Sequence, residues 1–160
     1  MSEKVVTSRQ LVPILNRARA EKKRIVFTNG CFDLMHVGHT RYLQAAKALG
    51  DVLVVGVNSD LSVRSLNKAP DRPIVSEANR AEVLAALGCV DYVVIFAEPD
   101  PLKLITALEP DVLVKGGDWA IDKIVGREIV EGRGGTVKTI PLVPGMSTTA
   151  LVDRIRTPST

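Results

Sequence analysis

GCFDLMHVGH, residues 30–39, follows closely on the apolar run 25–27 and is the most informative stretch of the 160-residue sequence. A β-like run leads into a glycine turn, and a helical pattern of apolar residues follows from about residue 40. Such a strand–turn–helix gathers free backbone N–H groups and the positive end of a helix dipole at one point, which suits a phosphate. His36 and His39 are three positions apart, so both can reach an anion there and donate to it.

Two histidines near a helix start also fit a structural helix cap or a pair of metal ligands. They are the only histidines of the chain, and both fall in one four-residue window beside the glycine turn. A zinc site uses three or four clustered ligands, and only Cys31 and Asp33 are nearby. We therefore predict an anion site in which no metal is held by protein side chains.

The rest of the chain alternates between short apolar runs and helical patterns. Strands are expected at about 24–29, 52–57, 92–96, 112–114 and 136–140. Helices are expected after a cap at Thr7 or Ser8, at about 37–49, between Ser76 and Gly88, from Asp100-Pro101 with the proline at the first helical position, and after Ser147. We expect a polar loop at 61–75 and a glycine-rich segment with one short helical piece at 115–135.

This alternation predicts an α/β fold with a doubly wound parallel sheet of the Rossmann-like type. The run 52–57 is apolar throughout, as is typical of a strand buried on both faces. We expect one domain over residues 1–160, with its core at about 22–156. Ligands of such folds bind at the carboxyl ends of the strands, where the Gly30 turn, residues 58–60 and residues 115–119 would meet.

Composition and charge exclude several classes of protein. No apolar run approaches the length of a membrane span, and the first ten residues lack the apolar core of a signal peptide, so we expect a cytoplasmic protein without a membrane partner. The net charge of +3 is mild and scattered, and aromatic residues make up only 4%, which argues against nucleic-acid binding. Neither a GxxxxGK loop nor a GxGxxG fingerprint occurs, which argues against a kinase or a dehydrogenase.

Two further segments have the chemistry of a nucleotide site. Ser147 and Thr148 open the last expected helix, where hydroxyls and free N–H groups would form a second anion site, although a cap alone also explains Ser147. The paired glycines at 116–117 permit close approach of the backbone to a planar base. Trp119, the only tryptophan, is either a contact for adenine or ribose or a core residue.

Residues 28–39 resemble the HxGH signature of the cytidylyltransferase-like nucleotidyltransferases. Further landmarks follow in order: Val57–Asp60, Arg72-Pro73, Arg80, Lys115–Trp119, Gly126, Gly134-Gly135 and Gly145–Thr149. Over about residues 22–156 they resemble the branch of adenylyltransferases that makes ADP-heptose from D-glycero-D-manno-heptose 1-phosphate. The resemblance implies transfer of AMP from ATP to that sugar phosphate, with release of pyrophosphate, for the inner core of lipopolysaccharide.

The resemblance also assigns roles to individual residues. Catalysis would rest on His36, His39 and Lys68. ATP would be bound by Asn29, Gly30, Cys31, Phe32, Gly38, Arg80, Lys115, Gly117, Asp118, Trp119, Ser147 and Thr148. The acceptor would be bound by Asp33, Asp60 and Arg72. The plainer alternative for the lysine and the arginines is solvated surface charge, and for the two aspartates it is orientation of a histidine or the end of a strand.

ATP would enter as its magnesium complex, and the resemblance implies a homodimer. The nearest alternative is a cytidylyltransferase that acts on glycerol 3-phosphate or a similar small acceptor. Those enzymes carry an arginine shortly before their Ser-Thr-Thr element, where this chain has Leu142 and Val143, which favours the heptose branch. A nucleotide-binding regulator without activity is the alternative from another class, and the presence of both histidines argues against it.

Overall fold

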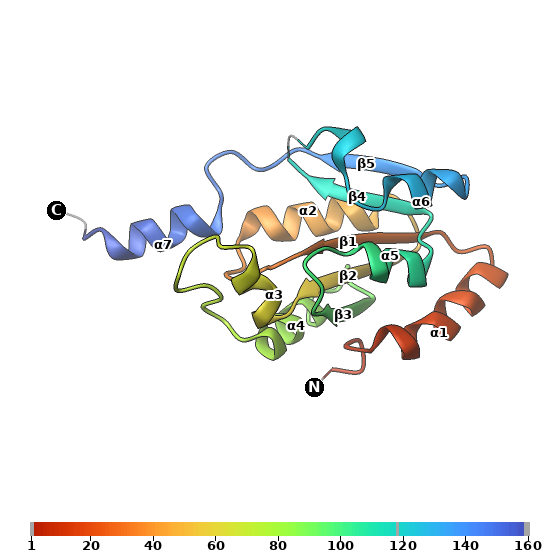
Figure 1. Cartoon of the computed structure of the whole chain (residues 1–160), viewed down its shortest axis with the longest axis horizontal. Helices are drawn as coiled ribbons and strands as arrows, with labels where there is room; N and C mark the ends of the chain where they lie inside the picture. Colours follow the sequence, from red (N-terminus) through yellow and green to blue (C-terminus); the bar gives the residue numbers. More distant parts are fainter. Residues whose placement is uncertain (1, 118, 159–160) are drawn as a thin grey trace.

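The computed structural model describes residues 2–117 and 119–158, which form a five-stranded parallel sheet with helices on both faces (Figure 1). The strands are β1 (Ile25–Gly30), β2 (Val52–Asn58), β3 (Tyr92–Phe96), β4 (Val112–Gly116) and β5 (Thr136–Ile140), in the order β3-β2-β1-β4-β5. The helices are α1 (Ser8–Ala20), α2 (Val37–Lys47), α3 (Asp60–Ser65), α4 (Glu77–Ala85), α5 (Leu102–Leu108), α6 (Arg127–Gly132) and α7 (Thr148–Arg156), with a 3-10 turn η1 (Ile121–Lys123). The predicted fold class is confirmed.

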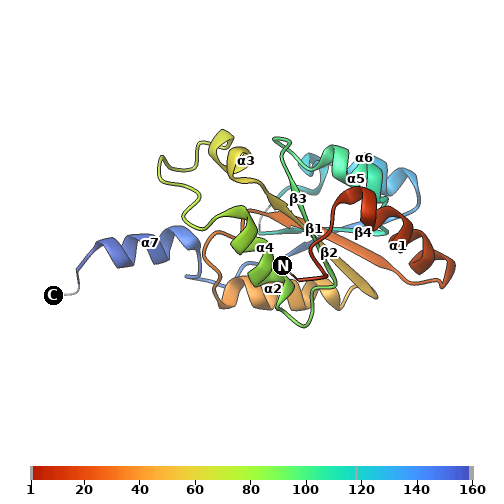
Figure 2. The ribbon, with the colours of Figure 1, turned by 90° about the horizontal axis from the view of Figure 1, so that it is seen from below.

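Two hydrophobic cores lie on the two faces of the sheet. Figure 2 shows α2 and α4 on one face and α1, α5 and α6 on the other. The first face buries Leu43 of α2 and Leu84 of α4 against the sheet, and the second buries Leu11 of α1, Ile105 of α5 and Val130 of α6. Each strand therefore contributes side chains alternately to two cores, which is why the central strands are apolar throughout.

Two local predictions were wrong. The expected polar loop at 61–75 begins with the helix α3, because the Ser59 side chain accepts from the N–H of Ser62 as an N-cap and Val63 is buried against the body. Pro101 is the N-cap of α5 rather than its first residue, and the Asp100 carboxylate accepts from the N–H of Leu102.

The sheet opens between β1 and β4 at its carboxyl edge. These two strands pair only at Val26–Val112 and Phe27–Leu113. The ladder of β1 with β2 continues to Gly30, and the ladder of β4 with β5 continues to Gly116. The strand order also reverses here, since β2 and β3 lie on one side of β1 and β4 and β5 on the other. This is the crevice in which ligands of doubly wound sheets bind.

The helix α7 extends past the carboxyl edge of the sheet, away from the body (Figure 1). Its Val152 is buried, whereas Ile155 is 78% exposed. The hydroxyl of Thr148 donates to the carbonyl oxygen of Leu34 at 3.2 Å, which ties the start of α7 to the turn after β1. In the described part of the chain, no helix has both the length and the apolar character needed to cross a membrane.

Candidate active site

A cavity of about 510 Å³ occupies the crevice at the carboxyl edge of the sheet. This volume is typical of small-molecule sites. The walls come from the turn after β1, the loop after α3, the end of β4 and the segment leading into α7. Most of the predicted site residues line it: Asn29, Gly30, Cys31, Phe32, Asp33, His36, Gly38, His39, Lys68, Arg72, Lys115, Trp119, Ser147 and Thr148.

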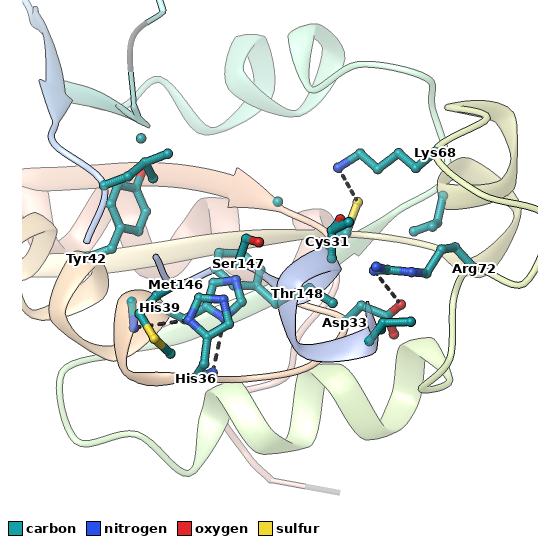
Figure 3. A pocket seen from close by; sticks show the side chains of 18 of the residues that line it. Cys31, Asp33, His36, His39, Tyr42, Lys68, Arg72, Met146, Ser147 and Thr148 are labelled. Carbon is teal, nitrogen blue, oxygen red and sulfur yellow. Dashed lines mark hydrogen bonds and ion pairs between the residues drawn. The ribbon is translucent and has the colours of Figure 1, made fainter. Parts of the chain in front are cut away.

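The two histidines cap the helix α2 with their own rings. His36 is the N-cap, and its Nδ1 accepts from the N–H of Gly38 at 3.1 Å. The Nδ1 of His39 accepts from the N–H of His36 at 3.3 Å, which completes a capping box built from imidazoles. The rings stack with their centroids 3.9 Å apart (Figure 3). The same two residues can therefore serve as a helix cap and as donors to an anion, because capping occupies only one nitrogen of each ring.

Both histidines are neutral near pH 7. Burial lowers the pKa of His39 to about 4, and the charge of His36 is a second cause. Burial also lowers the pKa of His36. A neutral ring whose Nδ1 accepts a hydrogen bond carries its proton on Nε2. The pair therefore presents two Nε2–H donors on rings that line the cavity, as an anionic ligand requires.

This arrangement makes the stability of the protein depend on pH. The unfolded chain protonates its histidines below about pH 6.5, whereas folded His39 stays neutral down to about pH 4. The unfolded state then binds more protons, so the free energy of unfolding should fall as the pH drops from 6.5 towards 4. We expect urea unfolding at pH 7.5, 6.5 and 5.5 to show this fall, and to show less of it in His39→Gln. Equal pH slopes for the two proteins would contradict a lowered pKa.

Gly38 leaves room for the histidine pair. A Cβ atom at this position would lie 2.8 Å from the ring of His36 and 3.3 Å from the Cβ of Met146. Gly30 is similarly close to the ring of Phe32, at 3.0 Å. The two glycines therefore let the rings of the turn lie against the backbone, whether or not they also contact a ligand.

Arg80 and Asp60 lie behind the turn rather than in the cavity. The side chain of Arg80 is fully buried and donates to the carbonyl oxygens of Cys31 at 2.7 Å and Val75 at 2.9 Å, and to the carboxylate of Asp60 at 2.8 Å. Because the C=O and N–H of one peptide unit point in opposite directions, holding the Cys31 carbonyl inward turns the N–H of Phe32 outward. Phe32 has φ +50°, a left-handed conformation that this anchoring helps to maintain.

Asp33 fixes the loop that leads into α4. Its carboxylate accepts from the N–H groups of Ile74 and Val75 at 3.0 and 2.9 Å, and from Arg72 at 3.3 Å. Asp33 is only 5% exposed, and Arg72 is mostly buried beside it. Both line the cavity, but the carboxylate is already bound to the loop, so its first role in this structure is to position that loop.

Lys68 and Lys115 both line the cavity. The ammonium group of Lys68 lies 3.7 Å from the Cys31 sulfur (Figure 3). The Lys115 ammonium lies 5.7 Å from the centroid of the Trp119 ring, which is 57% exposed and lines the cavity. Trp119 is therefore not a core residue. Burial lowers the pKa of Lys115, and the nearby charge of Lys68 contributes.

The start of α7 lies beside the turn that contains the histidines. Ser147 is its N-cap, and the Ser147 hydroxyl accepts from the N–H of Ala150 at 3.0 Å. Both Ser147 and Thr148 line the cavity while holding these structural contacts. Gly117 has φ +82°, and a Cβ there would lie 3.1 Å from Leu142, so it supports the cavity wall without being part of the lining. Asp118 lies outside the described residues.

Sequence reasoning missed several residues of the cavity. Tyr42 spans the opening of the sheet: its hydroxyl donates to the carbonyl of Val114 at 3.3 Å and lies 2.6 Å from the hydroxyl of Thr28. Burial raises the pKa of Tyr42 to about 12, so the hydroxyl stays protonated. Its position three residues after His39 could have placed it on the same helix face.

The remaining lining residues come from segments without a motif of their own. Leu142, Val143 and Met146 form an apolar wall, and Arg156 of α7 pairs with Asp71 across the cavity. Leu142 is 65% exposed although it is large and apolar, as expected for a side chain that faces a ligand rather than the core. The approach of Arg156 to Asp71 depends on the direction of α7, which sequence patterns do not give.

A parallel sheet with an open crevice and neutral imidazole donors at a helix start defines a nucleotide-binding enzyme. The chain belongs to the cytidylyltransferase-like family, whose model matches residues 27–155, and it is a nucleotidyltransferase. It is 56% identical over 149 residues to the bifunctional protein HldE of Geotalea uraniireducens, covering 93% of this chain and 30% of that one. Identity to HldE of Geobacter metallireducens is 57% over 145 residues, covering 91% and 29%.

The chain thus spans about 30% of the length of these curated relatives. It is also similar to a crystal structure, that of the lipopolysaccharide core biosynthesis protein from Thermoplasma volcanium. The TM-score is 0.61 at 32% identity, and the match covers 76% of this chain and 97% of the other.

Proposed function

We propose that this protein transfers AMP from ATP to D-glycero-D-manno-heptose 1-phosphate, which yields ADP-heptose and pyrophosphate for the lipopolysaccharide core. The observation that carries the proposal is the neutral pair His36 and His39, held with both Nε2–H groups free at the crevice. Similarity to the HldE proteins and to a lipopolysaccharide core biosynthesis protein supports the choice of acceptor.

In the proposed reaction an oxygen of the acceptor's phosphate attacks the α-phosphorus of ATP. The new P–O bond forms as the bond to the bridging oxygen of pyrophosphate breaks, and pyrophosphate leaves with that electron pair. No proton has to move, so the enzyme acts through position and charge stabilisation. The two Nε2–H groups would donate to the phosphate oxygens that gain charge in the transition state, and neutral donors hold that geometry without a change of protonation.

ATP would enter as its magnesium complex. Among residues 2–117 and 119–158, no group of three or more His, Cys, Asp or Glu side chains is placed to hold a metal ion. These residues therefore fit a magnesium ion that the phosphates and water coordinate, and when bound it would neutralise charge on the leaving pyrophosphate.

The chemistry of the cavity walls suggests how the substrates lie. The apolar wall of Leu142, Val143 and Met146, with Trp119 at the end of β4, suits a purine base. The opposite part, around Arg72 and Asp71, is charged and suits the polar parts of the substrates. As the resemblance implies, we also propose a homodimer in the cytoplasm, and light scattering would test the dimer.

Turnover of different substrate pairs tests the function. ATP with D-glycero-D-manno-heptose 1-phosphate should give a kcat/KM well above that of CTP with the same acceptor, because the larger apolar surface of a purine gains more from the wall of Leu142, Val143 and Met146. Pyrophosphate release would be measured for ATP and CTP against heptose 1-phosphate, glucose 1-phosphate and glycerol 3-phosphate. The HldE of Geobacter metallireducens provides a reference protein. Preference for CTP with glycerol 3-phosphate would replace the proposal by the cytidylyltransferase, and nucleotide binding without any turnover would replace it by a regulator.

A further inference from the structure

The opened part of the sheet has two sides, and one of them carries polar groups that the proposed chemistry has not used. Phe27 and Leu113 are register partners and belong to the same core, the one packed under α1 and α5. Side chains alternate along a strand, so Asn29 and Lys115, two residues further on, point to that same face. They lie on that face at the two edges of the gap, whereas α2 covers the opposite face (Figure 2).

This side of the gap has an excess of positive charge. Burial and the charge of Lys68 lower the pKa of Lys115, and the Lys68 ammonium lies 3.7 Å from the Cys31 sulfur. Within the described ranges 2–117 and 119–158, neither ammonium has a carboxylate within 4 Å. Lys115 is partly buried and Lys68 is exposed, and two cations that the described residues do not neutralise favour a bound anion.

An orphaned amide oxygen indicates what kind of anion fits. The Oδ1 of Asn29 is buried and has no hydrogen-bond partner. Leaving a buried acceptor unpaired is costly, so such atoms commonly await a ligand. Oδ1 needs a donor, which phosphate oxygens do not provide, and the ribose hydroxyls of ATP are separated from its β- and γ-phosphates by the α-phosphate. A sugar phosphate has both kinds of group: its phosphate oxygens accept from the lysines, and its hydroxyls donate to Oδ1.

We propose that Asn29, Lys68 and Lys115 form the subsite for the phosphate group of the acceptor, and that Asn29 binds a hydroxyl of the attached sugar. The inference rests on the proposed function and adds to it the placement of the nucleophile. The attacking phosphate would be held on one side of the crevice by the two ammonium groups, across from the histidines that bind the nucleotide. The lysines would also offset the repulsion between the dianionic acceptor and the triphosphate.

A single charge removal tests the subsite. Lys115→Met should raise the KM for heptose 1-phosphate at least tenfold while the dissociation constant for ATP stays within about twofold. Folding should be retained, because the change removes a half-buried charge, and the melting temperature checks this. Lys138→Met, at an exposed lysine of β5 outside the cavity, is the matched control and should change neither constant. If ATP affinity falls while the acceptor KM is unchanged, the subsite holds nucleotide phosphates and the proposal is overturned.

Binding without turnover separates this inference from the proposed function. Calorimetry with inorganic phosphate and with glucose 1-phosphate needs no ADP-heptose to form. Lys115→Met should weaken both ligands at least fivefold, and Asn29→Ala should weaken the sugar phosphate more than inorganic phosphate, since only the sugar phosphate has ring hydroxyls that can bind Oδ1 while its phosphate contacts the lysines. This result would support the subsite whatever the natural acceptor is. Equal binding by wild type and both variants would overturn it even if ADP-heptose is the product.

Discussion

His36→Asn should lower turnover by about 10²–10³-fold and leave the melting temperature and the ATP dissociation constant close to wild type. Asparagine is among the best N-cap residues, and its side-chain oxygen can accept from the N–H of Gly38 as Nδ1 now does. It has no group at the position of Nε2. The substitution therefore keeps the cap and removes the donor that we assign to the transition state.

His36→Ala is the matched comparison, because it removes both functions. It should lose the same turnover and, in addition, about 0.5–2 kcal/mol of stability from the missing cap. Single-turnover kinetics and thermal unfolding of the two variants would be measured side by side. Turnover of His36→Asn within about threefold of wild type would remove this ring from the mechanism and leave it as a helix cap.

Arg80→Met should be among the most destabilising single changes in the site, with a loss of about 3–5 kcal/mol in the free energy of unfolding. The arginine side chain is fully buried and bonds to Cys31, Val75 and Asp60, so its removal leaves two carbonyls and one carboxylate without their donor. Activity should fall as well, because the Cys31 peptide would no longer be held and the N–H of Phe32 would lose its fixed direction.

Arg64→Met, at an exposed arginine in the last turn of α3, controls for the loss of one positive charge. It should change stability by less than about 0.5 kcal/mol. The double variant Arg80→Met with Asp60→Asn should recover part of the stability, since the carboxylate is no longer left unpaired. A loss for Arg80→Met no greater than for Arg64→Met in urea unfolding would show that the buried contacts do not anchor the turn.

The turn after β1 could be predicted from sequence because its signal is local. One apolar run, one glycine and two histidines three positions apart predict the strand, the turn and the place of both rings at the start of the helix. It could not be predicted in the same way that each ring both caps the helix and lines the cavity. Whether an imidazole nitrogen faces a backbone N–H or a ligand depends on the backbone angles of His36, which residue types alone do not give.

For Arg80 the opposite holds. The sequence contained a periodic pattern that indicated burial, but a charged residue type is normally expected at the surface. Arg80, Ala81, Leu84 and Ala85 recur at helical spacing and are all buried, so the periodicity of α4 places the arginine on the inner face. Long charged side chains usually reach water, whereas the expectation that Arg80 contacts a phosphate came from the family resemblance. The side chain is buried because the Val75 carbonyl and two acceptors distant in sequence, on Cys31 and Asp60, converge on the guanidinium, and sequence patterns do not show that convergence.

Because the β1–β4 ladder ends early, the width of the active site is set by two strands of the sheet and not by a loop. Each wall is a strand still bonded to its outer neighbour as far as Gly30 or Gly116, and the Tyr42 hydroxyl spans the gap between them. Substrates therefore enter a gap that is already open and rigid. The loss of conformational freedom on binding falls on the loop after α3 and the segment before α7, while the floor of the site is preorganised.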